Sequence, residues 1–445
     1  MKRFWLVLLS LGLVLAFSAS AMAVDVKFSG SFYAAGIYLD KTSLVKDNNI
    51  STAFYHQRLR VETDFIVSPG LKLVTRFDAM ERIWGGARSD VGTTADSQSA
   101  GTRAENQNIA FEWAYVEYAS PIGIFQAGYN SDNTWGTVFG DSASGAPAGQ
   151  ISYMLPIKDF LVGAMIFKEG ELSRTSVTPS TTTDTDKDKY ILWGMYNINK
   201  DINVGLLYVY VRNAMDRAGV SPSNGSLTTF HVLEPYAKVK IGPVSVEAEL
   251  DYAWGKTKAE DGVIGSDVDI QSLMAYVNAV ADFGMVYAGG TFAYISGDDP
   301  NTKDKSESFL DGGMDWNPCL IMFNQDITYW AGAINGYAAG SAITSNSSPM
   351  SNAWFGQGKV GVRPIAPLDI MASLSYATAD KKPAGVLNSL YGWEIDVTGT
   401  YKLTNNLSYM LGVGYLFTGD YYKGDNNANS VTNNYILINK LTLTF

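Results

Sequence analysis

The 445-residue sequence predicts an all-β chain that folds as a transmembrane antiparallel β-barrel of about 18 strands, within a range of about 16–20. Three observations predict this class. Apolar and polar residues alternate along segments of ten or more residues, short turns alternate with long polar loops, and an apolar leader precedes the first such segment. The mean hydropathy of −0.02 is too low for a bundle of membrane-spanning helices.

The first 23 residues have the features of a secretory signal peptide. Lys2 and Arg3 give a basic start, and an apolar run from Phe4 to Ala19 follows. Ala21-Met22-Ala23 then has the A-x-A pattern of a cleavage site. We therefore expect residues 1–23 to be removed and residues 24–445 to form a single barrel domain. An uncleaved membrane helix is the alternative, but the apolar run is shorter than the ~20 residues needed to span a bilayer.

Period-two alternation is clearest from Val244 to Trp254, where one face carries V, V, A, L, Y and W and the other carries S, E, E and D. Side chains of a strand point alternately to opposite faces, so one face is apolar and the other charged. A soluble sandwich also alternates. Strand length, the asymmetry of the loops and aromatic residues near strand ends favour a membrane barrel instead. These aromatic residues are Trp84, Tyr118, Trp254, Tyr391 and Tyr401.

Turns and loops give the strand count. Short connections rich in Pro, Gly, Asn and Asp lie at 68–70, 120–123, 156–159, 199–201, 242–243, 282–284, 366–367 and 404–406. Long polar connections lie at 40–51, 85–107, 131–148, 169–187, 213–226, 256–268, 297–351, 380–388 and 418–432. Eight short turns and nine long loops predict about eighteen strands, with both termini on the short-turn side. In outer-membrane barrels the short turns are periplasmic and the long loops extracellular.

Charged side chains on the polar face indicate a pore rather than a plugged anchor. A Lys or Arg at the lipid midplane costs about 2–4 kcal/mol, so the arginines of the predicted strands should point inward. We expect Arg58, Arg60, Arg76 and Arg82 to form a basic wall on two neighbouring strands. Mutual ion pairing with Glu62, Asp64 and Asp78 is the alternative for some of them. A barrel of this size has room for an aqueous channel.

The loop from Asn130 to Gly149 carries a resemblance to a known family. Its Phe139-Gly140-Asp141 is similar to the Pro-Glu-Phe-Gly-Gly-Asp stretch of enteric porin constriction loops, with one Gly fewer and Thr137-Val138 in place of Pro-Glu. The whole mature chain resembles the Gram-negative trimeric outer-membrane porins. The resemblance implies that this third surface loop folds into the barrel.

The same resemblance implies roles for individual residues. Asp141, and with it Asp132, would form the acidic side of the constriction opposite the basic wall; a turn residue is the alternative for Asp141. The loop from Gly85 to Asn106 would contact a neighbouring subunit of a homotrimer. The final strand ends on Phe445, and a C-terminal aromatic residue is the signal handled by the outer-membrane assembly machinery.

These features predict a porin in the outer membrane of a Gram-negative bacterium that passes small hydrophilic solutes and ions by passive diffusion. A substrate-specific channel or an exopolysaccharide exporter of the alginate-export type is the alternative. No enzyme activity is expected, because neither His56 nor His231 has a nucleophile motif around it and the sequence has no GxSxG, Walker A or HExxH pattern. The net charge of −11 disfavours nucleic-acid binding.

A single Cys and two His predict no cofactor and no multi-Cys or multi-His metal site. The insertion at 297–351 is too long for a simple connection and could narrow the mouth, cap the pore or bind calcium at its acidic run. Cys319 within it is expected to be a free, shielded thiol. The weakly apolar stretch from Ile327 to Ile343 is expected to be a loop helix or a packed loop rather than a membrane span.

Overall fold

A computed structural model describes residues 24–47, 50–85, 109–131, 134–140, 147–172, 185–217, 225–259, 265–337 and 350–445. Eighteen strands build the barrel. They are β1 (Asp25–Leu39), β2 (Thr52–Ser68), β3 (Leu71–Ile83), β4 (Ile109–Ser120), β5 (Gly123–Ser131), β6 (Pro147–Ile157), β7 (Phe160–Gly170), β8 (Lys187–Asn199), β9 (Ile202–Asn213), β10 (Ser226–Ile241), β11 (Val244–Ala259), β12 (Val268–Asp282), β13 (Val286–Ile295), β15 (Ala353–Ile365), β16 (Leu368–Ala379), β17 (Leu390–Lys402), β18 (Leu407–Thr418) and β19 (Asn434–Thr444).

The described ranges contain few elements outside the barrel wall. They are the two-residue strand β14 (Lys305–Ser306), which pairs in parallel with the start of β12, the helix α2 (Gln325–Ala331), and the short 3₁₀ helices η1 (Met215–Arg217) and η2 (Asp420–Lys423). Among the described residues, no helix has the length and apolar character to cross a membrane. The predicted leader, residues 1–23, lies outside the described residues.

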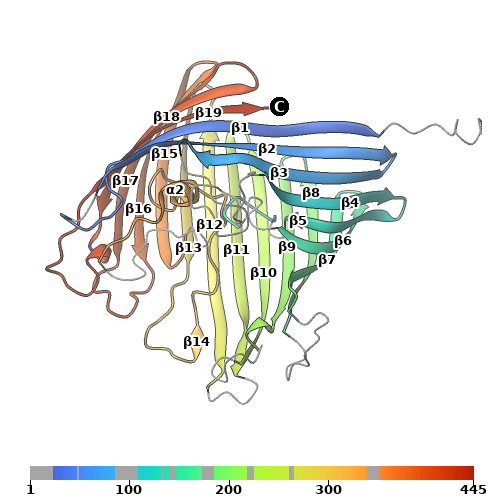
Figure 1. Ribbon diagram of the computed structural model, residues 1–445, viewed down its shortest axis with the longest axis horizontal. Coiled ribbons are helices and arrows are strands. Elements are labelled where there is room, and N and C mark those ends of the chain that lie inside the picture. The colour runs from blue at the N-terminus through green and yellow to red at the C-terminus, as the bar shows by residue number, and fades with distance from the viewer. Residues whose placement is uncertain are drawn as a thin grey trace, which may run out of the picture.

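The barrel closes through its first and last strands. Each barrel strand pairs antiparallel with the next, and β1 pairs with β19, with Ile37 opposite Ile438 (Figure 1). Phe445 completes the seam, because its N–H donates to Gly30 O at 3.0 Å and its carbonyl accepts from Gly30 N at 2.9 Å. Closure leaves no unpaired edge, which hydrocarbon could not satisfy with hydrogen bonds. The predicted fold class and strand number are confirmed.

The eight predicted short turns join strands at one end of the barrel, and nine longer connections join them at the other. Asp25 of β1 pairs with Ile66 beside the turn at 69–70, so the first strand begins at the short-turn end, where β19 finishes. The turn chemistry is local. Gly70 has a φ of +80° after Pro69, a conformation that a side chain would strain.

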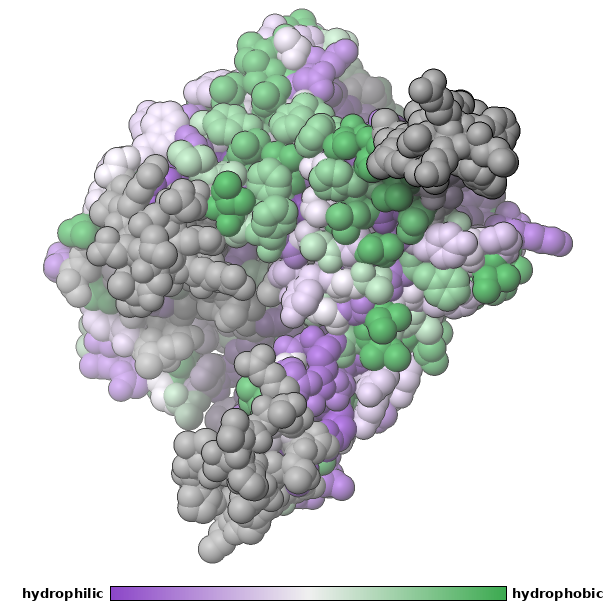
Figure 2. Space-filling view, turned by 45° about the vertical axis from the view of Figure 1, so that its right-hand side comes forward, coloured by the Kyte–Doolittle hydropathy of each residue, from purple (hydrophilic) through white to green (hydrophobic). Residues whose placement is uncertain are grey.

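The alternation is inverted relative to a soluble protein. On β11 the side chain of Leu250 is 45% exposed, whereas that of Asp251 is only 3% exposed. On β17, Trp393 and Ile395 are likewise exposed and Glu394 between them is buried. Hydrophobic side chains gather in a broad patch over the strands (Figure 2). The apolar face is therefore on the outside of the barrel, where lipid would contact it.

The outward position predicted for one aromatic side chain is wrong. Trp84, Tyr118 and Tyr401 are exposed near strand ends, but Tyr391 is buried. Its ring packs inside the barrel against that of Tyr421, with the centroids 4.5 Å apart. Tyr391 is the extra residue of a register shift at the start of β17, where Gly392 pairs with Ala377 and Leu390 with Thr378, so the alternation that puts Trp393 outside does not extend to it.

Candidate functional site

Three arginines of the predicted basic wall form ion pairs with carboxylates on neighbouring strands of the barrel. Arg60 of β2 makes a two-point contact with Asp78 of β3, both at 2.7 Å, and also donates to Glu112 of β4 at 3.0 Å. Arg76 Nε donates to Glu112 at 2.7 Å. Arg58 is 3.7 Å from Glu81. The ion pairing considered as the alternative is therefore present, but Glu81 and Glu112 take part in it.

A β-bulge explains part of this network. The register between β2 and β3 shifts after Leu59 pairs with Ala79, so that Gln57 pairs with Arg82. Between these two pairs β3 has two residues, Met80 and Glu81, where β2 has one. Met80 has a φ of +51°. A bulge re-aims the side chains beside it. Arg82 of β3 is buried, and the guanidinium carbon of Arg76 lies 3.4 Å from the centre of the Trp113 ring.

The described part of the third loop, residues 134–140 between β5 and β6, lies against the inner side of the barrel wall. Trp135 Nε1 donates to the backbone oxygen of Glu234 on β10 at 3.0 Å, and the Thr137 amide donates to the carboxylate of Glu249 on β11. Phe139 is fully buried and stacks on Tyr276 of β12, with the centroids 5.0 Å apart. The loop therefore reaches from β5 and β6 to the wall at β10–β12.

The acidic residues predicted for this loop, Asp132 and Asp141, lie outside the described residues. The described lumen places other carboxylates beside the loop. Glu249 and Asp251 of β11 are buried there. The strand register that pairs Leu233 with Tyr252 sets Glu234 opposite Asp251. The alternating pattern had placed these side chains on the polar face but gave no reason to connect them with the third loop.

The described residues of the seventh loop between β13 and β15, 296–337 and 350–352, also fold into the barrel, and α2 lies within the ring of strands (Figure 1). Asn324 caps α2 by accepting the Ile327 amide at 2.9 Å. Trp330 of α2 packs on His56 of β2, with the ring centroids 4.4 Å apart. The expected loop helix is thus present, while residues 338–343 of the stretch lie outside the described residues.

The seventh loop is fixed to β17 by hydrogen bonds from its backbone amides. Glu394 of β17 accepts the amides of Ile321 and Met322, both at 2.7 Å. Asp396 accepts the amide of Leu320 at 3.3 Å. Cys319 is free and buried, as expected from the sequence. The two loops also contact each other, because the Gly313 amide donates to the carbonyl of Phe139 at 2.6 Å and Trp316 packs edge-on against its ring.

Apolar side chains fill part of the lumen. Inward residues of β7–β10, among them Phe167, Ile191 and Val232, pack with Trp135 of the third loop and Phe309 of the seventh. A larger cluster joins Phe139, Trp316 and Phe323 to the wall at β12–β18. The bore is therefore much narrower than the ring of strands alone would make it.

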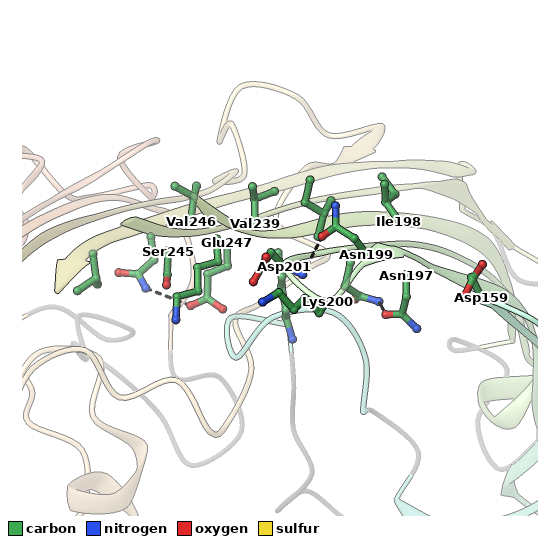
Figure 3. A pocket seen from close by; sticks show the side chains of 16 residues that line it. Asp159, Asn197, Ile198, Asn199, Lys200, Asp201, Val239, Ser245, Val246 and Glu247 are labelled. Atoms are coloured by element: carbon green, nitrogen blue, oxygen red, sulfur yellow. Dashed lines mark hydrogen bonds between the residues drawn. The ribbon is translucent and has the colours of Figure 1, made fainter. Parts of the chain in front are cut away.

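The short-turn end holds a polar cavity of about 600 Å³. In Figure 3, Ser245 and Glu247 point to the side where the loops pass, and Val246 points away from it. Glu247 accepts the side-chain amide of Asn278 at 3.1 Å. The charged residues that line the cavity are three lysines and three acidic residues, namely Lys200, Lys238, Lys240, Asp159, Asp201 and Glu247. Both signs are present, so the cavity favours neither anions nor cations by net charge.

Two smaller expectations concern the histidines and the acidic run of the seventh loop. His56 is buried among aromatic rings, and His231 Nδ1 is 2.7 Å from the Tyr208 hydroxyl. In the acidic run, hydrogen bonds from Asn301 hold the pKa of Asp299 below its ordinary value.

No protein-family model matches the chain, and no curated protein is similar to it in sequence. The fold is shared with solved structures of outer-membrane porins of Gram-negative bacteria. Acinetobacter baumannii OccAB1 matches with a TM-score of 0.55 and 13% identity over 96% of this chain and 99% of that one.

Two Pseudomonas aeruginosa structures are similar to the same extent. The outer membrane protein OpdK matches with a TM-score of 0.52 and 12% identity over 95% of this chain and 99% of its own. OccK2 (OpdF), solved in complex with glucuronate, matches with a TM-score of 0.51 and 12% identity over 95% and 98%. Identities this low establish the class of fold, a closed antiparallel barrel with long loops at one end, and nothing finer.

Proposed function

We propose that this chain is a channel of the Gram-negative outer membrane that passes small hydrophilic solutes through a bore narrowed by two inward-folded loops. One observation carries the proposal. The apolar face of a closed barrel is outside, while inside it Phe139 of the third loop meets Trp316 of the seventh. A polar cavity opens toward the short-turn end below these loops. The structures with this fold are outer-membrane porins, which supports the same location.

The lumen contents support a selective channel over a wide diffusion pore. Apolar side chains of both loops occupy space that a general porin would leave to water, and a polymer exporter would need a wider passage still. The complex of OccK2 with glucuronate shows that a barrel of this fold can bind a small organic acid. We therefore propose that the channel passes selected small solutes by passive diffusion.

Within this channel we propose that Arg58, Arg60, Arg76 and Arg82 line one side of the narrow zone. On the other side we propose Glu249 and Asp251, in addition to the sequence candidates Asp132 and Asp141. Rings and clusters of charge at a constriction act on ions in a confined field. Asp251→Asn should lower the preference for cations, seen as a shift of reversal potential in a salt gradient. Asp369→Asn, at the short-turn end of β16, is the control.

Assembly and export are separate proposals. We propose a homotrimer in the outer membrane, reached after removal of residues 1–23 and insertion by the assembly machinery through Phe445. The hydrogen bonds of Phe445 to Gly30 support a role of the last residue in closing the barrel. Light scattering of the detergent complex measures the oligomeric state, and N-terminal sequencing of protein from outer membranes should begin at Val24.

Planar-bilayer recording tests the channel itself. Purified, folded protein should give stepwise currents of small amplitude. In a series of solutes of graded size, the largest solute that passes should be smaller than the largest that a general porin passes. Shortening the seventh loop between residues 316 and 331 should enlarge the current steps. A folded barrel that inserts into the bilayer and gives no stepwise current would overturn the proposal.

A further inference from the structure

Three side chains of metal-ligand type converge where the seventh loop meets the barrel wall. Ligand atoms of Cys319, Glu394 and Asp396 all lie within 4.8 Å of one another. Within the described part of the chain, no other set of three His, Cys, Asp or Glu residues is so arranged. The side chains are 3%, 0% and 2% exposed, respectively, so bulk solvent has little access to them.

The two carboxylates are poorly compensated by charge. Glu394 and Asp396 share the inner face of β17, and their cross-strand neighbours on β16 are Ser375 and Ser373. On β18 the neighbour of Asp396 is Gly414. Neither flanking strand therefore places a cation in register with the pair. Two buried carboxylates this close are costly unless a cation or a proton is shared between them.

One carboxylate oxygen of the cluster accepts no hydrogen bond of normal geometry. Asp396 Oδ1 is buried and has no hydrogen-bond partner, while Oδ2 of the same carboxylate accepts the Leu320 amide. A buried acceptor without a partner is unusual and costs about 1–3 kcal/mol. The ideal position of a Cβ on Gly414 would be 2.6 Å from this oxygen, so the wall leaves space beside it only because residue 414 is glycine.

The remaining contacts hold the ligands in place. Both oxygens of Glu394 accept backbone amides, and each carboxylate oxygen still has a second lone pair. Such outer hydrogen bonds orient ligating carboxylates in metal sites. The Asn324 side chain donates to the carbonyl of Cys319 at 2.7 Å, and the Cys319 thiol contacts Ser375 Oγ at 3.2 Å. The loop and the strand are thus aligned before any ion binds.

We propose that Cys319, Glu394 and Asp396 form a binding site for a zinc ion that clamps the seventh loop to the wall of the lumen. A thiolate with two carboxylates suits a divalent transition ion and not calcium or magnesium, which take oxygen ligands. As the Zn–S bond forms, the thiol releases its proton to solvent. Two carboxylate oxygens complete the protein ligands, and water takes the fourth position of a tetrahedral ion.

Cobalt binding tests the site directly, because a Co²⁺–thiolate bond gives a charge-transfer band in the near ultraviolet. The full chain in detergent, freed of metal with EDTA, is titrated with Co²⁺ and then with Zn²⁺. The band should saturate at one ion per chain, and Zn²⁺ should displace it. Zn²⁺ should also slow amide hydrogen exchange at Ile321 and Met322.

Matched variants separate the site from adventitious binding. Cys319→Ser should abolish the band and the effect of Zn²⁺ on hydrogen exchange, and Asp396→Asn should weaken zinc binding by at least about tenfold. Asp299→Asn, an acidic residue of the same loop outside the cluster, should change neither. Heat-modifiable gel migration confirms that each variant is a folded barrel.

The proposal is overturned if the folded wild type gives no thiolate band, or if Cys319→Ser keeps it. If Cys319→Ser does not fold, unchanged zinc affinity in folded Asp396→Asn overturns it. Failure of the zinc proposal can be told apart from failure of the channel proposal. Cobalt binding is measured in detergent without conduction, whereas the metal-free wild type reports on conduction alone.

Discussion

The carboxylate of Glu394 on β17 accepts the backbone amide of Met322 at 2.7 Å. It also accepts the preceding amide of Ile321 at the same distance. One side chain of the barrel wall therefore fixes two consecutive peptide groups of the seventh loop, which lie 73 and 72 residues earlier in the chain. Hydrogen bonds to a charged group contribute about 1.5–3 kcal/mol each.

Glu394→Gln should release this part of the seventh loop. The amide side chain has one acceptor oxygen where the carboxylate has two, so one backbone N–H loses its partner. We expect amide hydrogen exchange at residues 319–323 to accelerate at least about tenfold, from the loss of roughly 1.5 kcal/mol or more. Glu247→Gln in the polar cavity is the control. Unchanged exchange in Glu394→Gln would show that other contacts hold the loop.

Cys319 should be almost inert to alkylation in the folded protein. Burial raises the pKa of its thiol, so at any given pH the thiolate fraction is below that of an exposed cysteine. Reaction with maleimide, followed by mass spectrometry, should therefore stay slow as the pH rises from about 7 to about 9, a range in which ordinary thiols titrate. Denatured protein should react fast throughout. Rapid labelling of folded protein at about pH 7 would contradict the burial of this thiol.

Arg60→Gln should destabilise the barrel more than an equivalent change at its rim. It leaves Asp78 without its two-point partner and Glu112 with one guanidinium fewer, and breaking a buried pair costs about 3–5 kcal/mol. Arg363 also contacts two carboxylates, Asp282 and Asp369, but at an exposed turn. Arg363→Gln should therefore cost only about 1 kcal/mol.

Urea unfolding of both variants in lipid vesicles measures the difference in the free energy of unfolding. Because Arg60→Gln also removes a positive charge from the lumen, its reversal potential in a salt gradient should move toward cation preference. Equal destabilisation of the two variants would mean that the lumen network is no better protected from water than the rim.

Phe139→Ala should detach the third loop from the wall. The ring is fully buried between Tyr276 and Trp316, and truncation of a buried Phe costs about 3–5 kcal/mol. Single-channel current steps should become larger and noisier as the loop leaves its position. Val138→Ala, at the exposed neighbouring residue, should leave the recordings unchanged. If the two variants conduct alike, Phe139 does not control the bore.

The carboxylates that pair with the basic wall could be predicted from the sequence only in part. The alternation placed Arg58 and Arg60 on the inner face, and Asp78 was among the partners considered. Glu112 was not, although it contacts both Arg60 and Arg76. It lies beyond a long loop, and a second bulge, after Arg76, sets its register on β4. Bulges change which side chains face each other without a clear sign in a single sequence.

The sequence by itself determined the barrel. Its evidence is local, since alternation, Pro-Gly turns such as that at Pro69 and Gly70, and loop lengths each depend on a few neighbouring residues, and closure follows once the strands are in lipid. Only the tertiary structure decided what fills the barrel. Cys319 and Glu394 are far apart in the chain, and no periodicity connects them. Packing of irregular loops depends on shape and hydrogen-bond partners supplied by distant strands, which a one-dimensional pattern does not contain.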